Sequence, residues 1–171
     1  MAKKNTKKTK GERVLTSAFR VSYPKLVEKD ELAGKYTLQM LFEPKDLKGL
    51  KATAKKVAKE AFGTDDVVMP FRDGSDKGFD EYVIVNAKSN FRPAVFDKKG
   101  NQITDPEEIR ELIYGGCYAR AQVVVLPYEF AGKQGITIAL LGVQFVRDGE
   151  AFGGSSVSFD AIDEVEDDDW E

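Results

Sequence analysis

Hydrophobic and polar residues alternate in several segments of the chain, and a period of two predicts β-strands. The alternation is cleanest in residues 35–43, where Tyr36, Leu38, Met40 and Phe42 share one side. Similar patterns predict strands at residues 14–23, 35–43, 82–90, 117–128 and 136–147, with Pro24 ending the first and residues 131–135 forming the turn between the last two. We expect the hydrophobic side of each strand to face one core.

The period changes in residues 46–62, where hydrophobic residues recur every three to four positions and lysines occupy the other side. This pattern predicts an amphipathic helix, with Asp46 as its N-cap and Gly63 at its end. A shorter helix is predicted at residues 106–113, because Asp105 can cap it and Pro106 suits a first helical turn.

Strands predominate in this order of elements. The sequence lacks the β-α-β alternation that is typical of a parallel sheet. The fold class is therefore mainly β, with minor α. Five principal strands, one long helix and one short helix fit an OB-fold-like, five-stranded antiparallel barrel. We expect the aromatic residues Phe42, Tyr36 and Phe62 to belong to its core.

Charge is segregated along the chain, although the net charge is only −3. Residues 1–10 hold five lysines and no acid, whereas residues 160–171 hold eight acids and no base. The composition predicts a disordered basic arm at 1–12, a folded domain at 13–152 and a disordered acidic tail at 153–171.

The residue types that are missing exclude much chemistry. There is one cysteine, Cys117, and no histidine, so the usual zinc sites and Ser/His or Cys/His nucleophile pairs are excluded. We expect no metal, no cofactor and no catalytic residue. No apolar run is long enough to span a membrane and no apolar stretch follows the N-terminal lysines, so the expected location is the cytoplasm.

Aromatic residues and cations are interleaved on several predicted strands, a pattern typical of proteins that bind single-stranded nucleic acid. Residues i and i+2 of a strand share a face, so Tyr118 and Arg120 point together, opposite an apolar row that begins at Cys117. The candidate DNA-binding residues are Tyr118, Arg120, Phe91, Arg92, Lys88, Arg72 and Lys77, with Phe19, Arg20, Tyr23 and Arg147 as second choices.

The acidic tail carries one aromatic residue near its end, in the sequence Asp167, Asp168, Asp169, Trp170 and Glu171. Such a segment can anchor its ring in a basic, apolar pocket of a partner protein. It can also compete for the DNA-binding groove of its own protein, a role that requires mainly the charge.

Five ordered segments resemble the landmarks of a bacteriophage family of OB-fold single-stranded-DNA-binding proteins. They are Arg20–Pro24, Pro70–Gly74, Asn86–Pro93, Tyr114–Ala121 and Gly142–Glu150 with Gly153 and Gly154. The resemblance implies an OB fold, DNA binding without strong sequence preference, and a role in phage replication or recombination. The tail is similar to acidic tails that recruit replication or recombination proteins, although Glu171 here follows the aromatic residue.

Two alternatives remain open from the sequence. A magnesium-dependent nuclease would have to use acids such as Asp65, Asp66, Asp73, Asp76, Asp80 or Glu81, which follow no recognisable metal-loop spacing. A protein-interaction module without DNA affinity would depend on its tail alone. The sequence also leaves the oligomeric state open, a homodimer included.

Overall fold

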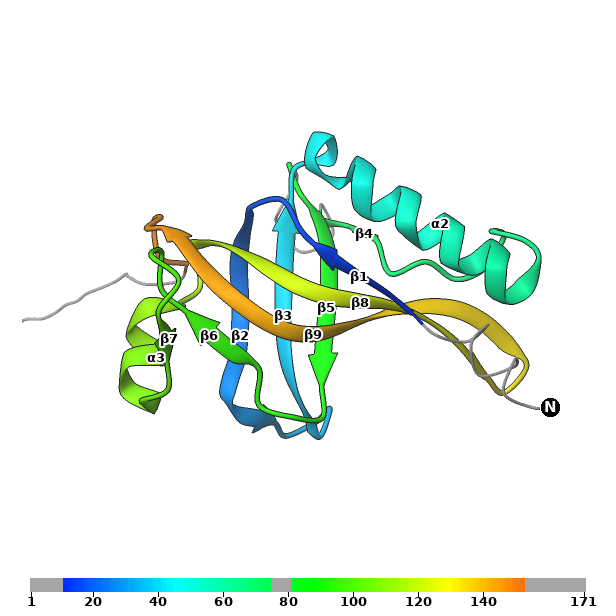
Figure 1. Ribbon diagram of the computed structural model, residues 1–171. Helices are drawn as coiled ribbons and strands as arrows, with labels where there is room; N and C mark the ends of the chain where they lie inside the picture. Colours follow the sequence, from blue (N-terminus) through cyan, green and yellow to red (C-terminus); the bar gives the residue numbers. More distant parts are fainter. Residues whose placement is uncertain (1–10, 75–80, 153–171) are drawn as a thin grey trace, which may run out of the picture.

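The computed structural model describes residues 11–74 and 81–152, and its main feature is a closed β-barrel (Figure 1). Five strands form the barrel in the order β2, β3, β5, β9, β8 and back to β2. The strands of the described residues are β1 (Glu12–Leu15), β2 (Phe19–Asp30), β3 (Lys35–Phe42), β4 (Arg72–Asp73), β5 (Val83–Ser89), β6 (Ala94–Phe96), β7 (Gln102–Ile103), β8 (Tyr118–Phe130) and β9 (Lys133–Arg147).

The barrel confirms the predicted fold class and its five principal strands. Four of its five pairings are antiparallel. The fifth differs from the antiparallel expectation, because β5 and β9 run parallel and pair only at Lys88 and Ala139. This order matches a five-stranded Greek-key barrel of the OB type.

The core lies inside the barrel and follows the predicted alternation closely. On β8, the row that begins beside Cys117 is fully buried, with Ala119, Val123 and Val125 each exposing no surface. On β3, Phe42 is buried, whereas Tyr36 is only half-buried. Phe62, also expected in the core, is half-buried at the end of its helix.

Strand β2 differs most from the prediction, because it continues through Pro24 to Asp30. Between Ser22 and Lys25 it holds one more residue than the facing part of β3, which makes a β-bulge. Tyr23 takes a left-handed φ of 44° there. Proline is tolerated at bulges because the ladder does not need its missing N–H, so it does not end this strand.

The long helix, α2 (Lys48–Phe62), packs across β8, β9 and β1. It buries the predicted apolar stripe, and Gly63 ends it with a φ of 78° while donating its N–H to the Lys59 carbonyl. Asp46 is not its cap: the helix is entered through a 3₁₀ turn, Pro44–Leu47, and Leu47 stands at the N-cap without a side-chain bond.

The short helix, α3 (Pro106–Leu112), forms as predicted. It lies beside β2 (Figure 1). The Asp105 carboxylate accepts a hydrogen bond from the Glu108 N–H at 3.1 Å, which is the expected cap. The β6–β7 hairpin before α3 is not predicted by the sequence pattern. It adds to the barrel through parallel pairing of β6 with β9.

The β8–β9 hairpin is longer than predicted and projects beyond the barrel (Figure 1). Its strands pair as far as Phe130 and Lys133, joined by Ala131 and Gly132. Both turn residues have positive φ, 52° and 82°, which is typical of two-residue hairpin turns that match strand twist.

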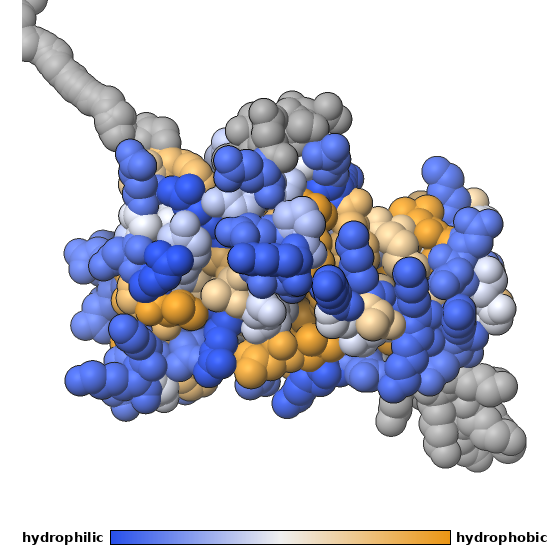
Figure 2. Space-filling view, turned by 90° about the horizontal axis from the view of Figure 1, so that it is seen from above, coloured by the Kyte–Doolittle hydropathy of each residue, from blue (hydrophilic) through white to orange (hydrophobic). Residues whose placement is uncertain are grey.

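Within the described residues, no helix has the length and apolar character needed to cross a membrane. Viewed from above, the surface is mostly hydrophilic, with smaller hydrophobic patches between the hydrophilic residues (Figure 2).

Candidate nucleic-acid interface

A groove of about 790 Å³ runs between the outer face of β5, the segment before β4 and the β8–β9 hairpin. We call it the hairpin groove. It is lined by Lys35, Val68, Met69, Pro70, Arg72, Asn86, Lys88, Tyr128, Phe130, Ile136 and Thr137.

Backbone hydrogen bonds fix the walls of the hairpin groove. The Val68 N–H donates to the Gln134 carbonyl at 3.1 Å, and the Ile136 N–H donates to the Val68 carbonyl at 2.9 Å. Arg72 pairs with Ile84 on β5, which places the short strand β4 along the same face. The groove is thus preformed from four segments that are distant in the sequence.

The charge in the hairpin groove is of one sign. Lys35, Arg72 and Lys88 line it, and no acidic residue does. Lys88 points outward because its neighbour Ala87 faces the core. None of the three cations forms a salt bridge with another residue in the described ranges. Unpaired cations along a groove are suited to a chain of phosphates.

Two aromatic residues, Tyr128 and Phe130, line the hairpin groove from the same strand. Phe130 is 78% exposed, so its ring is accessible to a nucleobase. The Tyr128 ring lies against Gly135 on the paired strand, so closely that a Cβ there would stand 2.6 Å from the ring. Both rings are spaced i, i+2 and therefore belong to one face of β8.

The structure brings only part of the predicted set together. Arg72 and Lys88 line the hairpin groove, whereas Lys77 lies outside the described residues. Phe91 is 81% exposed just beyond the end of β5. Arg92 does not line the groove; it donates a hydrogen bond to the Thr104 carbonyl at 3.4 Å.

Tyr118, Arg20 and Arg147 form a separate cluster. The Arg147 guanidinium carbon lies 3.8 Å from the centre of the Tyr118 ring, and that of Arg20 lies 5.8 Å from it. Arg20 also donates hydrogen bonds to the carbonyls of Gly116 and Glu150, at 3.0 and 2.6 Å. Through these contacts Arg20 and Arg147 hold segments of the chain together. None of the three residues of the cluster lines the hairpin groove.

Three other candidates stand elsewhere. Phe19 is only 2% exposed and its ring centre lies 5.3 Å from that of Phe42, so the prediction of a DNA contact is corrected to a core position. Arg120 donates to the Gln144 side chain at 2.9 Å and lines a different pocket. Tyr23 is 73% exposed at the β2 bulge.

Lys35, Tyr128 and Phe130 are groove residues that the sequence reasoning missed. The signal was the spacing of Tyr128 and Phe130, two aromatic residues sharing a strand face just before a turn. The sequence pattern does not assign Phe130 to a strand face, because the predicted strand ends at Tyr128.

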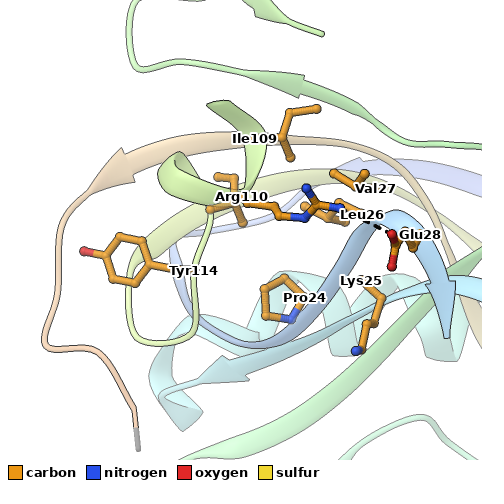
Figure 3. Close-up of a pocket in the computed structure, with 9 residues that line it drawn as sticks. Pro24, Lys25, Leu26, Val27, Glu28, Ile109, Arg110 and Tyr114 are labelled. Carbon is orange, nitrogen blue, oxygen red and sulfur yellow. Dashed lines mark hydrogen bonds and ion pairs between the residues drawn. The ribbon is translucent and has the colours of Figure 1, made fainter. Parts of the chain in front are cut away.

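A second cavity, of about 240 Å³, lies between the bulged part of β2 and α3 (Figure 3). Arg110 from α3 reaches toward Glu28 on β2, and the two form a salt bridge at 3.4 Å. Arg110 and Glu28 neutralise each other and leave Lys25 as the remaining charged lining residue, so this cavity offers fewer cations to a phosphate chain than the hairpin groove.

The acids considered for a nuclease do not form a metal site in the described residues, where no three His, Cys, Asp or Glu residues are grouped to hold an ion. Asp65 pairs with Lys59 at 3.8 Å. Asp76 and Asp80 lie outside the described residues, as do Asp167, Asp168, Asp169 and Trp170 of the tail.

Comparison with known proteins identifies phage proteins as relatives of this chain. Residues 12–170 match the family described as "Enterobacter phage Enc34, ssDNA-binding protein". A putative protein, p50, of Acyrthosiphon pisum secondary endosymbiont phage 1 is 32% identical in an alignment of 171 positions, which covers 86% of this chain and 89% of that protein.

Solved structures show the same fold. The single-stranded-DNA-binding protein of bacteriophage Enc34 in complex with ssDNA matches with a TM-score of 0.72 and 24% identity, over 85% of this chain and 94% of the other. The gp2.5 single-stranded-DNA-binding protein of bacteriophage T7 matches with a TM-score of 0.66 and 18% identity, over 85% and 91% of the two chains.

Proposed function

Because the chain belongs to the family of the single-stranded-DNA-binding protein of Enterobacter phage Enc34, we propose that it binds single-stranded DNA in the hairpin groove. The observation that carries this assignment is the composition of the groove. It combines three cations, no acidic residue and two aromatic rings on one strand face.

The aromatic residues and the cations of the groove have different roles in this proposal. Bases stack on the rings of Tyr128 and Phe130, and the phosphates follow Lys35, Arg72 and Lys88. Every base has a π-face, so stacking tolerates any sequence, and phosphate contacts carry no sequence information. Duplex DNA hides its base faces inside the helix, which gives the preference for single strands.

The binding needs no metal or cofactor, since neither stacking nor charge pairing requires one. In a phage-infected cell such binding protects and organises DNA during replication or recombination. Recruitment of replication or recombination proteins by the acidic tail, around Asp167, Asp168, Asp169 and Trp170, belongs to the same proposal, and the eight acids without a base in residues 160–171 support it.

Fluorescence anisotropy of labelled oligo-dT, compared with a duplex of equal length, tests the proposal. We expect Tyr128→Ala combined with Phe130→Ala to weaken oligo-dT binding about 30-fold or more, because each base stacked on a ring contributes about 1–3 kcal/mol. The matched control is Tyr23→Ala, which removes an exposed ring outside the groove and leaves the affinity unchanged.

Two results would contradict the proposal. Equal affinity for single strand and duplex would remove stacking as the basis of binding. Unchanged affinity in the double variant would place the DNA elsewhere, with the cluster at Tyr118 the next surface to test. Incubation of labelled DNA with magnesium in the same series separates binding from cleavage, because a nuclease would shorten the oligonucleotide.

A further inference from the structure

Strand β1 covers only part of one edge of β8. Its residues pair with β8 from Leu15 and Gln122 to Glu12 and Val125. Beyond Val125, β8 continues to Phe130 and pairs only with β9 within the described residues. One edge of the projecting hairpin therefore has no paired strand in the described part of the chain. This edge lies directly beyond the first residue of β1 (Figure 1).

The unpaired edge of β8 presents backbone groups to a further strand. The Thr16 N–H donates to the Ala121 carbonyl at 2.9 Å, so every second residue of β8 from Ala121 on directs its backbone groups toward β1. By this alternation, the groups of Pro127 and Glu129 face the unpaired edge. Because proline has no N–H, a strand added here forms fewer hydrogen bonds and needs a second source of stabilisation.

The chain already lies against β8 where the described residues begin. A Cβ at Gly11 would meet the Val125 carbonyl oxygen and would stand 2.6 Å from side-chain carbons of Leu126 and Val124. The φ of Gly11 is not left-handed, so it is this close approach that excludes a side chain there. Residues 1–10 lie outside the described residues, and they join the described chain at a point in contact with β8.

Continuation of the β1 register toward the N-terminus gives a complementary pair of charges. It sets Lys8 directly opposite Glu129. Glu129 is exposed and forms no salt bridge within the described ranges. Opposite charges at facing positions stabilise a pair of strands, so this edge favours the lysine-rich segment as its occupant.

The same register divides the lysines of the segment between the two faces of the hairpin. Facing residues of paired strands share a side of the sheet, and neighbours along a strand alternate between sides. Lys7 comes opposite Phe130, on the side that carries the ring. Lys10 comes opposite Pro127, on the other side, and Pro127 does not line the hairpin groove.

We propose that residues 7–10 extend β1 along the free edge of β8 when single-stranded DNA occupies the hairpin groove, and that Lys7 binds a phosphate beside Phe130. The inference rests on the proposed function, because the DNA supplies the second source of stabilisation. The three cations that line the groove stand on or next to β3, β4 and β5. Lys7 adds a phosphate contact at the projecting end of the hairpin, beyond their position.

Lys7→Ala and Lys10→Ala form a matched pair, because each removes one positive charge from the same segment. Fluorescence anisotropy of labelled oligo-dT across a salt series separates them in the full chain. We expect Lys7→Ala to reduce the magnitude of the slope of log affinity against log salt by about 0.7, and Lys10→Ala to leave it nearly unchanged. Removal of residues 1–10 should reduce the slope at least as much as Lys7→Ala and weaken binding several-fold.

Equal effects of Lys7→Ala and Lys10→Ala would overturn the proposal, because a segment that only adds positive charge does not distinguish two faces. An unchanged slope in both variants would also overturn it. Unchanged thermal unfolding verifies that the barrel is intact in each variant.

A disulfide between the segment and β8 tests the register itself. Lys8→Cys combined with Glu129→Cys places two thiols at facing positions, whereas Lys7→Cys combined with Glu129→Cys places them on opposite faces. With oligo-dT present, we expect the first pair to form a disulfide within one chain several-fold faster than the second. Cys117 is buried and does not compete. Equal rates would overturn the register, and a disulfide between two chains would assign the edge to a second copy.

Failure of this inference can be told apart from failure of the proposed function. If the groove variant Tyr128→Ala with Phe130→Ala weakens oligo-dT binding while removal of residues 1–10 changes neither slope nor affinity, the groove stands and the Lys7 contact is overturned. If the parent protein binds duplex as well as it binds oligo-dT, the proposed function fails and this inference fails with it.

Discussion

Gly135 has no side chain, and the position of the Tyr128 ring depends on that. It leaves room for the Tyr128 ring to lie against β9, where a Cβ would meet ring atoms at 2.6 Å. One face of the ring is thereby held by the strand. Preorganised rings bind bases with less loss of conformational entropy than mobile ones.

We expect Gly135→Ala to displace the Tyr128 ring and to weaken oligo-dT binding by roughly one stacked base, about 1–3 kcal/mol. Stability should change by no more than about 1 kcal/mol, because alanine is better than glycine in a strand interior and the ring can swing away. Anisotropy and urea unfolding measure the two effects. Gly49→Ala, which has open space around it in α2, is the control, and an equal loss of affinity in both variants would contradict the ring's role.

Cys117 is buried at the start of β8, and burial raises the pKa of its thiol to about 11, from an ordinary value of 9.0. The neutral thiol is favoured in the fold, so its contribution to stability is complete below pH 9 and is lost as the pH rises through 11. We expect the thiol to react with a disulfide reagent at pH 8 only as fast as the protein opens. Fast reaction in the native protein, measured against an unfolded sample, would contradict this.

Individual groove residues were only partly predictable. Strand alternation identifies which side chains share a face, and it correctly places Ala119 inside the barrel and Lys88 outside. It does not reveal which exposed strand faces lie side by side and line one groove. Tyr118 satisfied every local criterion, yet in the structure Arg147 covers its ring at 3.8 Å.

At the scale of elements, the sequence predicts the strands and helices better than their ends. The β2 bulge and the extension of β8 to Phe130 depend on pairing partners, β3 and β9, that a local pattern does not contain. The same applies to the short β6–β7 hairpin, which is held by β9. Asp46 failed as a cap because a 3₁₀ turn precedes α2.

Removal of the projecting end of the β8–β9 hairpin tests whether this element belongs to the DNA-binding site. Replacing residues 129–134 by Asn-Gly keeps the facing pair Tyr128 and Gly135 and supplies a favoured two-residue turn. We expect oligo-dT affinity to fall about five-fold or more through loss of Phe130. Stability should fall by about 1 kcal/mol, because the Gln134 carbonyl that accepts from the Val68 N–H is removed as well. Thermal unfolding and anisotropy test both, and unchanged affinity would exclude the hairpin tip from the site.

At the scale of the whole molecule, a net charge of −3 conceals a local cationic groove. Three phosphate contacts predict a slope of about −2 or steeper in a plot of log affinity against log salt, at roughly −0.7 per contact for single strands. Lys35→Ala, Arg72→Ala and Lys88→Ala should each reduce its magnitude by about 0.7. Lys45→Ala, outside the groove, should not, and equal slopes in all four variants would contradict the assignment.

The parallel meeting of β5 and β9 has a consequence for the motions of the barrel. This seam is held by one residue pair, Lys88 and Ala139, whereas β8 and β9 pair along most of their length. Lys88 lies on one side of the hairpin groove, and Ile136 and Thr137 lie on the other. A bound strand would therefore bridge the weakest closure of the barrel and act as a clamp. Amide hydrogen exchange near the seam should be among the fastest within the barrel strands of the free protein, and DNA should slow it most there.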